Sequence, residues 1–164
     1  MIHFERISSK NVWEICKLEV FAEQSEFVAT NLQSLAEAFA VRNDGFIAEP
    51  FGVYDGKKPI GFVMIGKGSV GDENEPELFL ENYCLWRLMV DKSEQKKGYG
   101  REIMKKAIEY IKTFPHGKAE YIWLSYDREN EVAKKLYAEF GFSENGMECD
   151  GEIVAVMKIM HSDR

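Results

Sequence analysis

An apolar run that leads through a glycine-containing turn into an amphipathic helix is the feature that most restricts how this chain can fold. Residues 85–90 form the apolar run, and Gly98 and Gly100 stand where the helical pattern begins. Apolar side chains then recur at helical spacing on one face, namely Ile103, Met104, Ala107, Ile108 and Ile111. A strand followed by a helix of this kind predicts a sheet that is covered by helices.

Further patterns around this unit predict a mixed α/β or α+β architecture. Strands are expected at 2–7, 51–66 (a hairpin turning at Asp55-Gly56), 83–90, 121–126 and 142–160 (a hairpin turning at Asp150-Gly151). Helices are expected at 11–22, capped by Ser8 or Ser9, and after Asn31, Gly98 and Asn130. Apolar residues share one face of the first helix, namely Val12, Ile15, Cys16 and Leu18, and stand at helical spacing in the second, namely Leu32, Leu35, Ala36 and Phe39. The helix after Asn130 is expected to bury Val132, Ala133, Leu136, Tyr137 and Phe140. The acidic segment 70–83 is expected to be a loop running into the next strand.

Length and composition narrow the class of protein. With 164 residues, the chain is expected to form one domain over 1–164. The net charge of -7 argues against broad binding to nucleic acid or to an anionic membrane, and it is compatible with a cationic small substrate. The longest apolar run, 60–65, is far shorter than the roughly 20 residues that span a bilayer. The first residues do not read as a secretory signal, and three widely separated cysteines in no metal-binding spacing fit a cytoplasmic location.

The turn before the helix has the composition of an anion site. Its spacing is Gln95-x-x-Gly98-x-Gly100, with Lys96 and Lys97 inside it. A helix N-terminus leaves amide donors without intrahelical partners, and glycine lets a ligand approach the main chain closely. Neither the Walker spacing nor the GxGxxG spacing of dinucleotide sites is present. The alternative is a glycine turn that merely enters a helix, with both lysines solvated.

This segment resembles motif A of the GNAT superfamily of N-acetyltransferases, [QR]-x-x-G-x-[GA] after a hydrophobic strand. The segment from Asn130 to Phe142, `NEVAKKLYAEFGF`, resembles the second motif of that family. Together the two motifs span about 83–142. The resemblance implies the GNAT fold, a mixed, mostly antiparallel central sheet flanked by helices. It also implies an enzyme that uses acetyl-CoA to acetylate an amine, with coenzyme A as the cofactor.

The resemblance also assigns roles to residues. Tyr137 matches a tyrosine that protonates the departing thiolate, although its position alone also fits a core tyrosine. Asn130 matches a contact to the cofactor arm and also fits a helix cap. Met89 and Val90 match the strand end beside pantetheine, where one amide polarises the thioester carbonyl. The pyrophosphate loop is matched by Gln95, Lys96, Lys97, Gly98, Tyr99, Gly100 and Arg101.

The general base is not assigned by the sequence. Attack on a thioester needs a neutral amine, so a base or a water chain must take a proton. Relatives carry acids about where Cys84 and Trp86 stand, and this chain has neither acid. Glu81, Glu26 or a water chain are the alternatives.

The acceptor is expected to be a diamine or polyamine such as spermidine. The segment 23–40 resembles a region of bacterial enzymes related to spermine/spermidine acetyltransferases. Its glutamates, Glu23, Glu26 and Glu37, are expected on a helical wall that faces the acidic segment from Asp72 to Glu81, with Trp86 available to stack on a cation. These acids could also be only solubilising.

Two other functions remain open from the sequence. One keeps the cofactor and changes the acceptor to a protein N-terminus, a lysine side chain or an aminoglycoside. The other is a module that senses acetyl-CoA without turnover, since Cys84 and Trp86 stand where relatives carry acids. A homodimer is expected by analogy with relatives alone.

Overall fold

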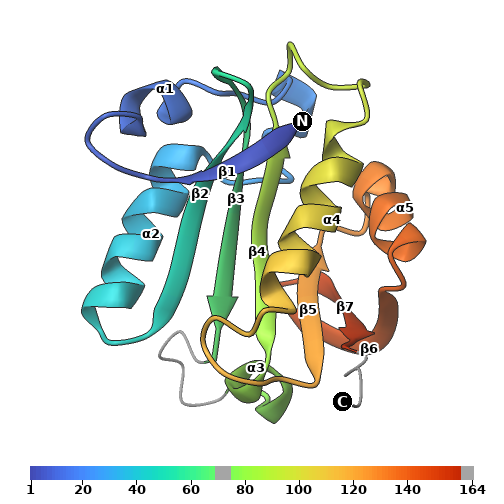
Figure 1. Cartoon of the computed structure of the whole chain (residues 1–164). Helices are drawn as coiled ribbons and strands as arrows, with labels where there is room; N and C mark the ends of the chain where they lie inside the picture. Colours follow the sequence, from blue (N-terminus) through green and yellow to red (C-terminus); the bar gives the residue numbers. More distant parts are fainter. Residues whose placement is uncertain (69–74, 160–164) are drawn as a thin grey trace.

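The computed structural model describes residues 1–68 and 75–159, which form a seven-stranded sheet with helices on both faces (Figure 1). The strands, in the spatial order β1-β2-β3-β4-β5-β7-β6, are β1 (Ile2–Arg6), β2 (Ile47–Asp55), β3 (Lys58–Lys67), β4 (Tyr83–Val90), β5 (Tyr121–Tyr126), β6 (Ser143–Cys149) and β7 (Glu152–Lys158). The helices are α1 (Val12–Cys16), the short 3₁₀ helix η1 (Ala22–Gln24), α2 (Asn31–Asn43), α3 (Glu77–Glu81), α4 (Tyr99–Ile111) and α5 (Glu131–Glu139). The mixed, mostly antiparallel sheet confirms the predicted fold class.

One pair of neighbouring strands is parallel, and it is short. β4 and β5 pair only through Tyr83 with Ile122 and Cys84 with Trp123, and all other neighbouring strands are antiparallel. Beyond Cys84, therefore, β4 keeps β3 on one edge while its other edge pairs with no strand in the described residues. Figure 1 shows β4 and β5 moving apart.

The two faces of the sheet carry two separate cores. Along β3, Val63 and Ile65 face α4, while Phe62 and Met64 face α1 and α2, as the period of two in a strand requires. The α4 side contains the buried face Ile103, Met104, Ala107, Ile108 and Ile111, which is the face predicted from the sequence. The other side contains Ile15, Ala38 and Met89.

A β-bulge at Trp86 changes which side chains of β4 face each core. Met64 pairs with Arg87 and Ile65 pairs with Leu85, so Trp86 is the additional residue. As a result Leu85 and Leu88, three residues apart, both lie on the α4 side, whereas Trp86 and Met89 both lie on the α1 and α2 side. The bulge sits beside the point where β4 and β5 separate.

Several local predictions are confirmed and others are wrong. The hairpin turns at Asp55-Gly56 and Asp150-Gly151 form, with positive φ at Gly56, Asp150 and Gly151. The predicted last strand extends to Met160, which lies outside the described residues. The first helix is much shorter than predicted and ends at Cys16. Its continuation is held against the loop after β4 instead, because the Glu19 amide donates to Asp91 Oδ1 and the Lys92 amide donates to the Glu19 carbonyl.

Helix capping and helix orientation also differ from the predictions. The residue at the N-cap of α1 is Asn11, not Ser8 or Ser9. Helix α2 buries Asn31, Ser34 and Ala38, while Leu32 and Phe39 of the predicted face are 57% and 75% exposed. The buried Asn31 amide donates to the Ile15 carbonyl, which fixes how the helix is rotated. On α5, Val132 is 76% exposed, although Ala133, Leu136, Tyr137 and Phe140 pack on the core as predicted.

The acidic segment is a loop only in part. Its end forms α3 after Pro76, and Phe79 on this helix stacks on Trp123 with ring centroids 3.7 Å apart. The missed signal is the proline that precedes a single buried aromatic residue. Residues 69–74, including Asp72 and Glu73, lie outside the described residues. Within 1–68 and 75–159, no helix is both long enough and apolar enough to span a bilayer.

Candidate functional site

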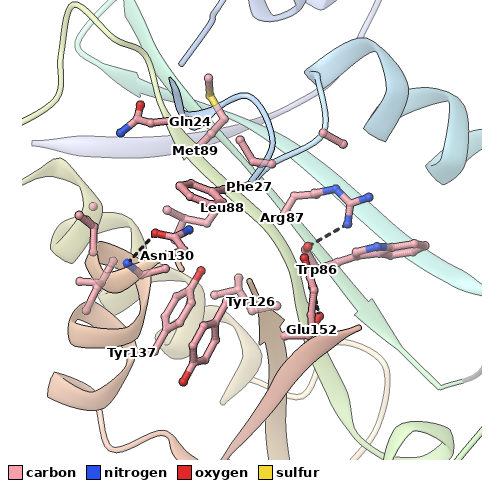
Figure 2. Close-up of a pocket in the computed structure, with 18 of the residues that line it drawn as sticks. Gln24, Phe27, Trp86, Arg87, Leu88, Met89, Tyr126, Asn130, Tyr137 and Glu152 are labelled. Carbon is pink, nitrogen blue, oxygen red and sulfur yellow. Dashed lines mark hydrogen bonds between the residues drawn. The ribbon is translucent and has the colours of Figure 1, made fainter. Parts of the chain in front are cut away.

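A cleft of about 1270 Å³ opens where β4 and β5 separate. Its walls come from the segment between η1 and α2, from β4, from the loop before α4, from α5 and from the turn between β6 and β7. Figure 2 shows Tyr137 and Asn130 on one side of the strands, with Trp86, Arg87 and Glu152 on the other. The cleft therefore has contributions from both faces of the sheet.

The open edge of β4 presents main-chain groups to this cleft. The Asp91 amide donates to the Ile60 carbonyl, which makes Ile60 and Asp91 a hydrogen-bonded pair of the antiparallel β3–β4 ladder. Such pairs alternate, so Phe62 and Met89 form the next one, and the main-chain groups of Leu88 and Val90 point away from β3. The Val90 carbonyl accordingly accepts from Gln95 Nε2 at 3.1 Å. The Leu88 and Val90 amides thus face the cleft, whereas the Met89 amide belongs to the sheet.

The loop before α4 forms a second set of exposed amides. Lys96 and Gly98 both have positive φ, at 63° and 89°, and the first intrahelical bonds run from the amides of Arg101 and Glu102 to the Gly98 carbonyl. The amides at the start of α4 therefore have no acceptor within the helix. Because glycine adopts positive φ without strain, Gly98 is suited to this N-cap. Alternating backbone conformations of this kind form concave anion sites.

The charges of the loop are largely used within the protein. Lys58 and Lys97 both donate to the carboxylate of Glu94, which is only 4% exposed. Arg101 makes two hydrogen bonds of 2.8 Å to Glu139 on α5. Lys96 has no ion-pair partner among the described residues. Of the two lysines in the sequence motif, Lys96 lines the cleft and Lys97 does not.

Glu94 is a structural centre of the loop that sequence reasoning missed. The hydrogen bonds from Lys58 and Lys97 lower its pKa to about 2. The neighbouring Gln95 forms a reciprocal amide pair with Gln24 of η1, at 2.8 and 3.1 Å. These bonds fix the loop to β3, to η1 and to the end of β4. A buried carboxylate that is compensated by two cations lets the loop keep its shape without any ligand.

Another wall of the cleft is formed by α5. Asn130 caps this helix, since its Oδ1 accepts from the Ala133 amide at 3.1 Å, and it also lines the cleft. Tyr137 lines the cleft and packs against the rings of Tyr126 and Phe142. Burial, with a smaller effect from the charge of Glu152, raises the pKa of Tyr137 above its ordinary value. Its hydroxyl has no hydrogen-bond partner among the described residues.

The α1 and α2 side of the cleft carries the candidates for acceptor binding. Trp86 is half-buried, with the Arg87 guanidinium 5.7 Å from its ring centroid. Arg87 is held by Glu37 at 2.8 Å. Glu23 and Glu26 line the cleft and are exposed, but they lie on η1 and in the turn after it rather than on a helical wall.

Some predicted residues are not brought to the cleft, and others were missed. Glu81 lies at the end of α3 in a different surface hollow, which removes it as a candidate base for this cleft. Glu75, from the acidic segment that was expected to face the substrate wall, does line the cleft. Phe79 also lines it, together with Glu148, Asp150 and Glu152 of the β6–β7 hairpin, and these residues were not predicted. The hairpin was predicted correctly, but periodicity along one strand does not show which other strand lies beside it. Among the lining residues, eleven are acidic and four are basic.

The cysteines do not form a reactive or metal-binding centre. Cys84 is buried, and burial raises the pKa of its thiol well above the ordinary value, which keeps it protonated. Cys16 and Cys149 are free and half-buried. Over the described ranges, no group of three or more His, Cys, Asp or Glu side chains is arranged to hold a metal ion.

Comparisons with known proteins agree with this geometry. The model of the family described as Acetyltransferase (GNAT) family matches residues 10–142. A protein described as "Probable spermine N(1)-acetyltransferase" from Bacillus subtilis subsp. natto is 28% identical over 161 residues, covering 96% of this chain and 99% of that protein.

Two solved structures have a similar fold. The aminoglycoside acetyltransferase AAC(6')-Ib in complex with coenzyme A has a TM-score of 0.74 at 14% identity and covers 96% of this chain and 95% of its own. The spermidine N-acetyltransferase from Vibrio cholerae in complex with CoA and spermine has a TM-score of 0.65 at 20% identity, with coverages of 96% and 94%.

The buried ion cluster at Glu94 predicts a pH-dependent stability. Because the folded-state pKa of about 2 lies below the ordinary 4.5, this stabilisation is complete above about pH 4.5 and is lost as the pH falls toward 2. We expect the Glu94→Gln variant to melt at a lower temperature than the wild type at pH 7, and the difference to shrink steadily below pH 4.5 in scanning calorimetry. Glu109→Gln, an exposed change on α4, serves as the control. A melting difference that is equal at pH 7 and pH 2.5 would contradict this account.

Proposed function

Because this chain belongs to the acetyltransferase (GNAT) family, we propose that it transfers the acetyl group of acetyl-CoA to a primary amine of a diamine or polyamine such as spermidine. The single observation that carries the proposal is the continuity of two sets of free amides in one cleft. The open edge of β4 leads directly to the exposed start of α4. The proposal treats residues 1–164 as one acetyltransferase domain.

The residues of the cleft fit coenzyme A by the chemistry of their donors. The amides around Gly98, Tyr99 and Gly100, with the positive end of α4, suit a pyrophosphate. Lys96 adds a charge that no carboxylate among the described residues neutralises. The pantetheine arm carries amide groups, and these match the unpaired amides and carbonyls along Leu88 to Val90. Bound acetyl-CoA supplies the acetyl thioester that the reaction consumes.

The main chain of β4 also provides a donor for the developing negative charge. Preorganised donors at an oxyanion commonly contribute about 2.7–4 kcal/mol each to catalysis. By the alternation of the ladder, Leu88 or Val90 provides this amide rather than Met89, because the Met89 amide faces β3. The family motif pointed to Met89 and Val90 for this role, and the ladder favours Val90 or Leu88 over Met89.

Tyr137 is suited to act as a general acid on the cofactor side. Its raised pKa keeps the phenol protonated at neutral pH, and its hydroxyl has no competing partner in the described part of the chain. The thiol that forms on departure has a reference pKa of about 8.5, which is below the pKa of the phenol. Proton donation from Tyr137 is therefore helpful only when its hydroxyl lies close to the departing sulfur.

The acceptor assignment is supported by charge and by relatives. An excess of acidic side chains around the cleft suits a substrate with several positive charges. Trp86 and Phe27 add apolar surface for a flexible alkyl chain. The similar Bacillus protein is described as acting on spermine, and the Vibrio structure contains spermine.

Gly98→Asp is predicted to abolish coenzyme A binding. The substitution adds a negative charge at the anion site and places a side chain where φ is 89°. Isothermal titration calorimetry with coenzyme A measures the loss. Gly117→Asp is a matched control, because Gly117 has φ of 92°, is also open to solvent and does not line the cleft. Retained affinity in Gly98→Asp would count against the placement of the pyrophosphate.

Tyr137→Phe is predicted to lower kcat about 10²-fold, the lower end of typical acid–base contributions, while leaving the affinity for coenzyme A unchanged. Steady-state release of free thiol and calorimetry measure the two quantities. Tyr110→Phe is the control: its hydroxyl donates to Glu49 at 2.6 Å, and it lies outside the cleft. If both variants kept the wild-type kcat, Tyr137 would be a packing residue only.

A substrate panel tests the acceptor. We expect thiol release from acetyl-CoA with spermidine, spermine or putrescine at a higher kcat/KM than with a lysine peptide, a peptide N-terminus or kanamycin. Turnover confined to peptides or kanamycin would replace the polyamine assignment. Binding of acetyl-CoA without turnover on any amine would indicate a sensor.

A further inference from the structure

An acceptor ammonium must lose a proton before it attacks, and β4 supplies no carboxylate near the point where β4 and β5 separate. Cys84 and Trp86 occupy the positions on β4 that face this side. Glu81 lies in another hollow. A carboxylate that acts at this point therefore comes from another element of the fold.

Glu152 on β7 is in that position. It follows the Asp150-Gly151 turn, is half-buried and lines the cleft. Ser125 Oγ on β5 donates to Glu152 Oε2 at 2.6 Å, which fixes the carboxylate. Ser125 alternates with Leu124 and Tyr126, which pack on the α4 side, so Ser125 and its partner Glu152 lie on the opposite side. That is the side of the sheet on which Cys84 and Trp86 also lie.

The charge of Glu152 is not compensated within the described residues. Two other acids that line the cleft and are shielded from solvent are paired with cations: Glu37 with Arg87 and Glu94 with two lysines. On the same hairpin, Glu144 contacts Lys134 and Glu148 contacts Arg128. Glu152 has the Ser125 hydroxyl and no cation. A half-buried carboxylate without a cation favours a positively charged ligand.

Glu152 and Tyr137 flank the gap from opposite sides. Tyr137 belongs to α5 and packs with the α4-side core, whereas Glu152 points to the other face (Figure 2). Burial is the main cause of the raised pKa values of Tyr137 and Cys84, and the negative charge of Glu152 adds a smaller effect to both. Tyr137 is therefore available on the thiol side of the gap, and Glu152 is available on the amine side.

We propose that Glu152 is the catalytic carboxylate that binds the reacting ammonium of the acceptor and removes its proton, an inference that rests on the proposed acetyltransferase function. The N–H bond of the ammonium breaks, an O–H bond forms on Glu152, and the nitrogen keeps the electron pair with which it attacks. Glu152 passes this proton to water in the open cleft. After the attack the nitrogen loses a second proton. This proton returns to Tyr137 and replaces the one that Tyr137 gives to the sulfur.

Glu26 is suited to a different role. It is exposed in the turn after η1 and has no hydrogen bond in the described structure that orients its carboxylate. A second, distant ammonium of a polyamine would interact with such a flexible acid. The reacting nitrogen, by contrast, needs the fixed carboxylate.

The test compares Glu152→Gln with Glu144→Gln. Both are isosteric changes on the same hairpin at a glutamate that accepts from a hydroxyl, and Glu144 does not line the cleft. We expect Glu152→Gln to lower kcat/KM for spermidine by about 10² to 10⁴-fold, the typical contribution of a general base. Calorimetry in the presence of coenzyme A should show spermidine affinity reduced about tenfold, as for loss of a charged hydrogen bond. Coenzyme A affinity, and all three quantities in Glu144→Gln, should remain at wild-type values.

The outcomes separate this inference from the proposed function. If the wild type acetylates spermidine and Glu152→Gln has the same kcat/KM as the wild type, the role of Glu152 is overturned. The proposed function is then unaffected. If the wild type acetylates only a lysine peptide or kanamycin, the polyamine assignment falls, and the same variants are compared on that acceptor. A loss of coenzyme A affinity in Glu152→Gln would show a structural defect and overturn the assignment. A wild type that neither binds nor acetylates any amine of the panel overturns both.

Discussion

The early separation of β4 from β5 is the constraint on which the rest of the site depends. Two residue pairs join these parallel strands, and beyond Cys84 no described strand covers the second edge of β4. Main-chain donors and acceptors that are left without water or protein partners are costly, so an open edge inside a cleft favours a ligand that carries its own amides. The bulge at Trp86 accompanies this opening and divides the side chains of β4 between the two cores.

Charge in the cofactor loop serves chiefly to hold the loop in place. Lys97 and Lys58 are bound to the buried Glu94, and Arg101 is bound to Glu139. The main chain between Lys96 and Gly100 is then held in a shape that directs amides outward. In this account the attraction for a diphosphate comes mostly from oriented dipoles, with Lys96 as the loop cation that is free to contribute. In the proposed function, the acidic side chains on the other side of the gap between β4 and β5 suit a cationic ligand rather than the diphosphate.

The sequence predicted the parts of the fold that depend on local pattern. The buried face of α4, the two tight turns and the glycine at the start of α4 follow from helical periodicity and glycine placement, and the structure contains all three. The sequence did not predict which face of α2 is buried, because a hydrogen bond from Asn31 to the distant Ile15 carbonyl sets its rotation and leaves Leu32 and Phe39 exposed. Glu94 and Glu152 were missed for the same reason. Their partners, Lys58 and Ser125, are brought to them by strand pairing that no local spacing reveals.

Amide hydrogen exchange along β4 tests the central claim most directly, because it reads single main-chain groups at the open edge. In the free protein the account predicts fast exchange at Leu88 and Val90 and slow exchange at Met89, whose amide is bonded to β3. Addition of coenzyme A should slow Leu88 and Val90, together with the amides from Gly98 to Gly100, and leave Met89 unchanged. Equal protection of all three β4 amides in the free protein, or no response of Leu88 and Val90 to saturating coenzyme A, would contradict the claim.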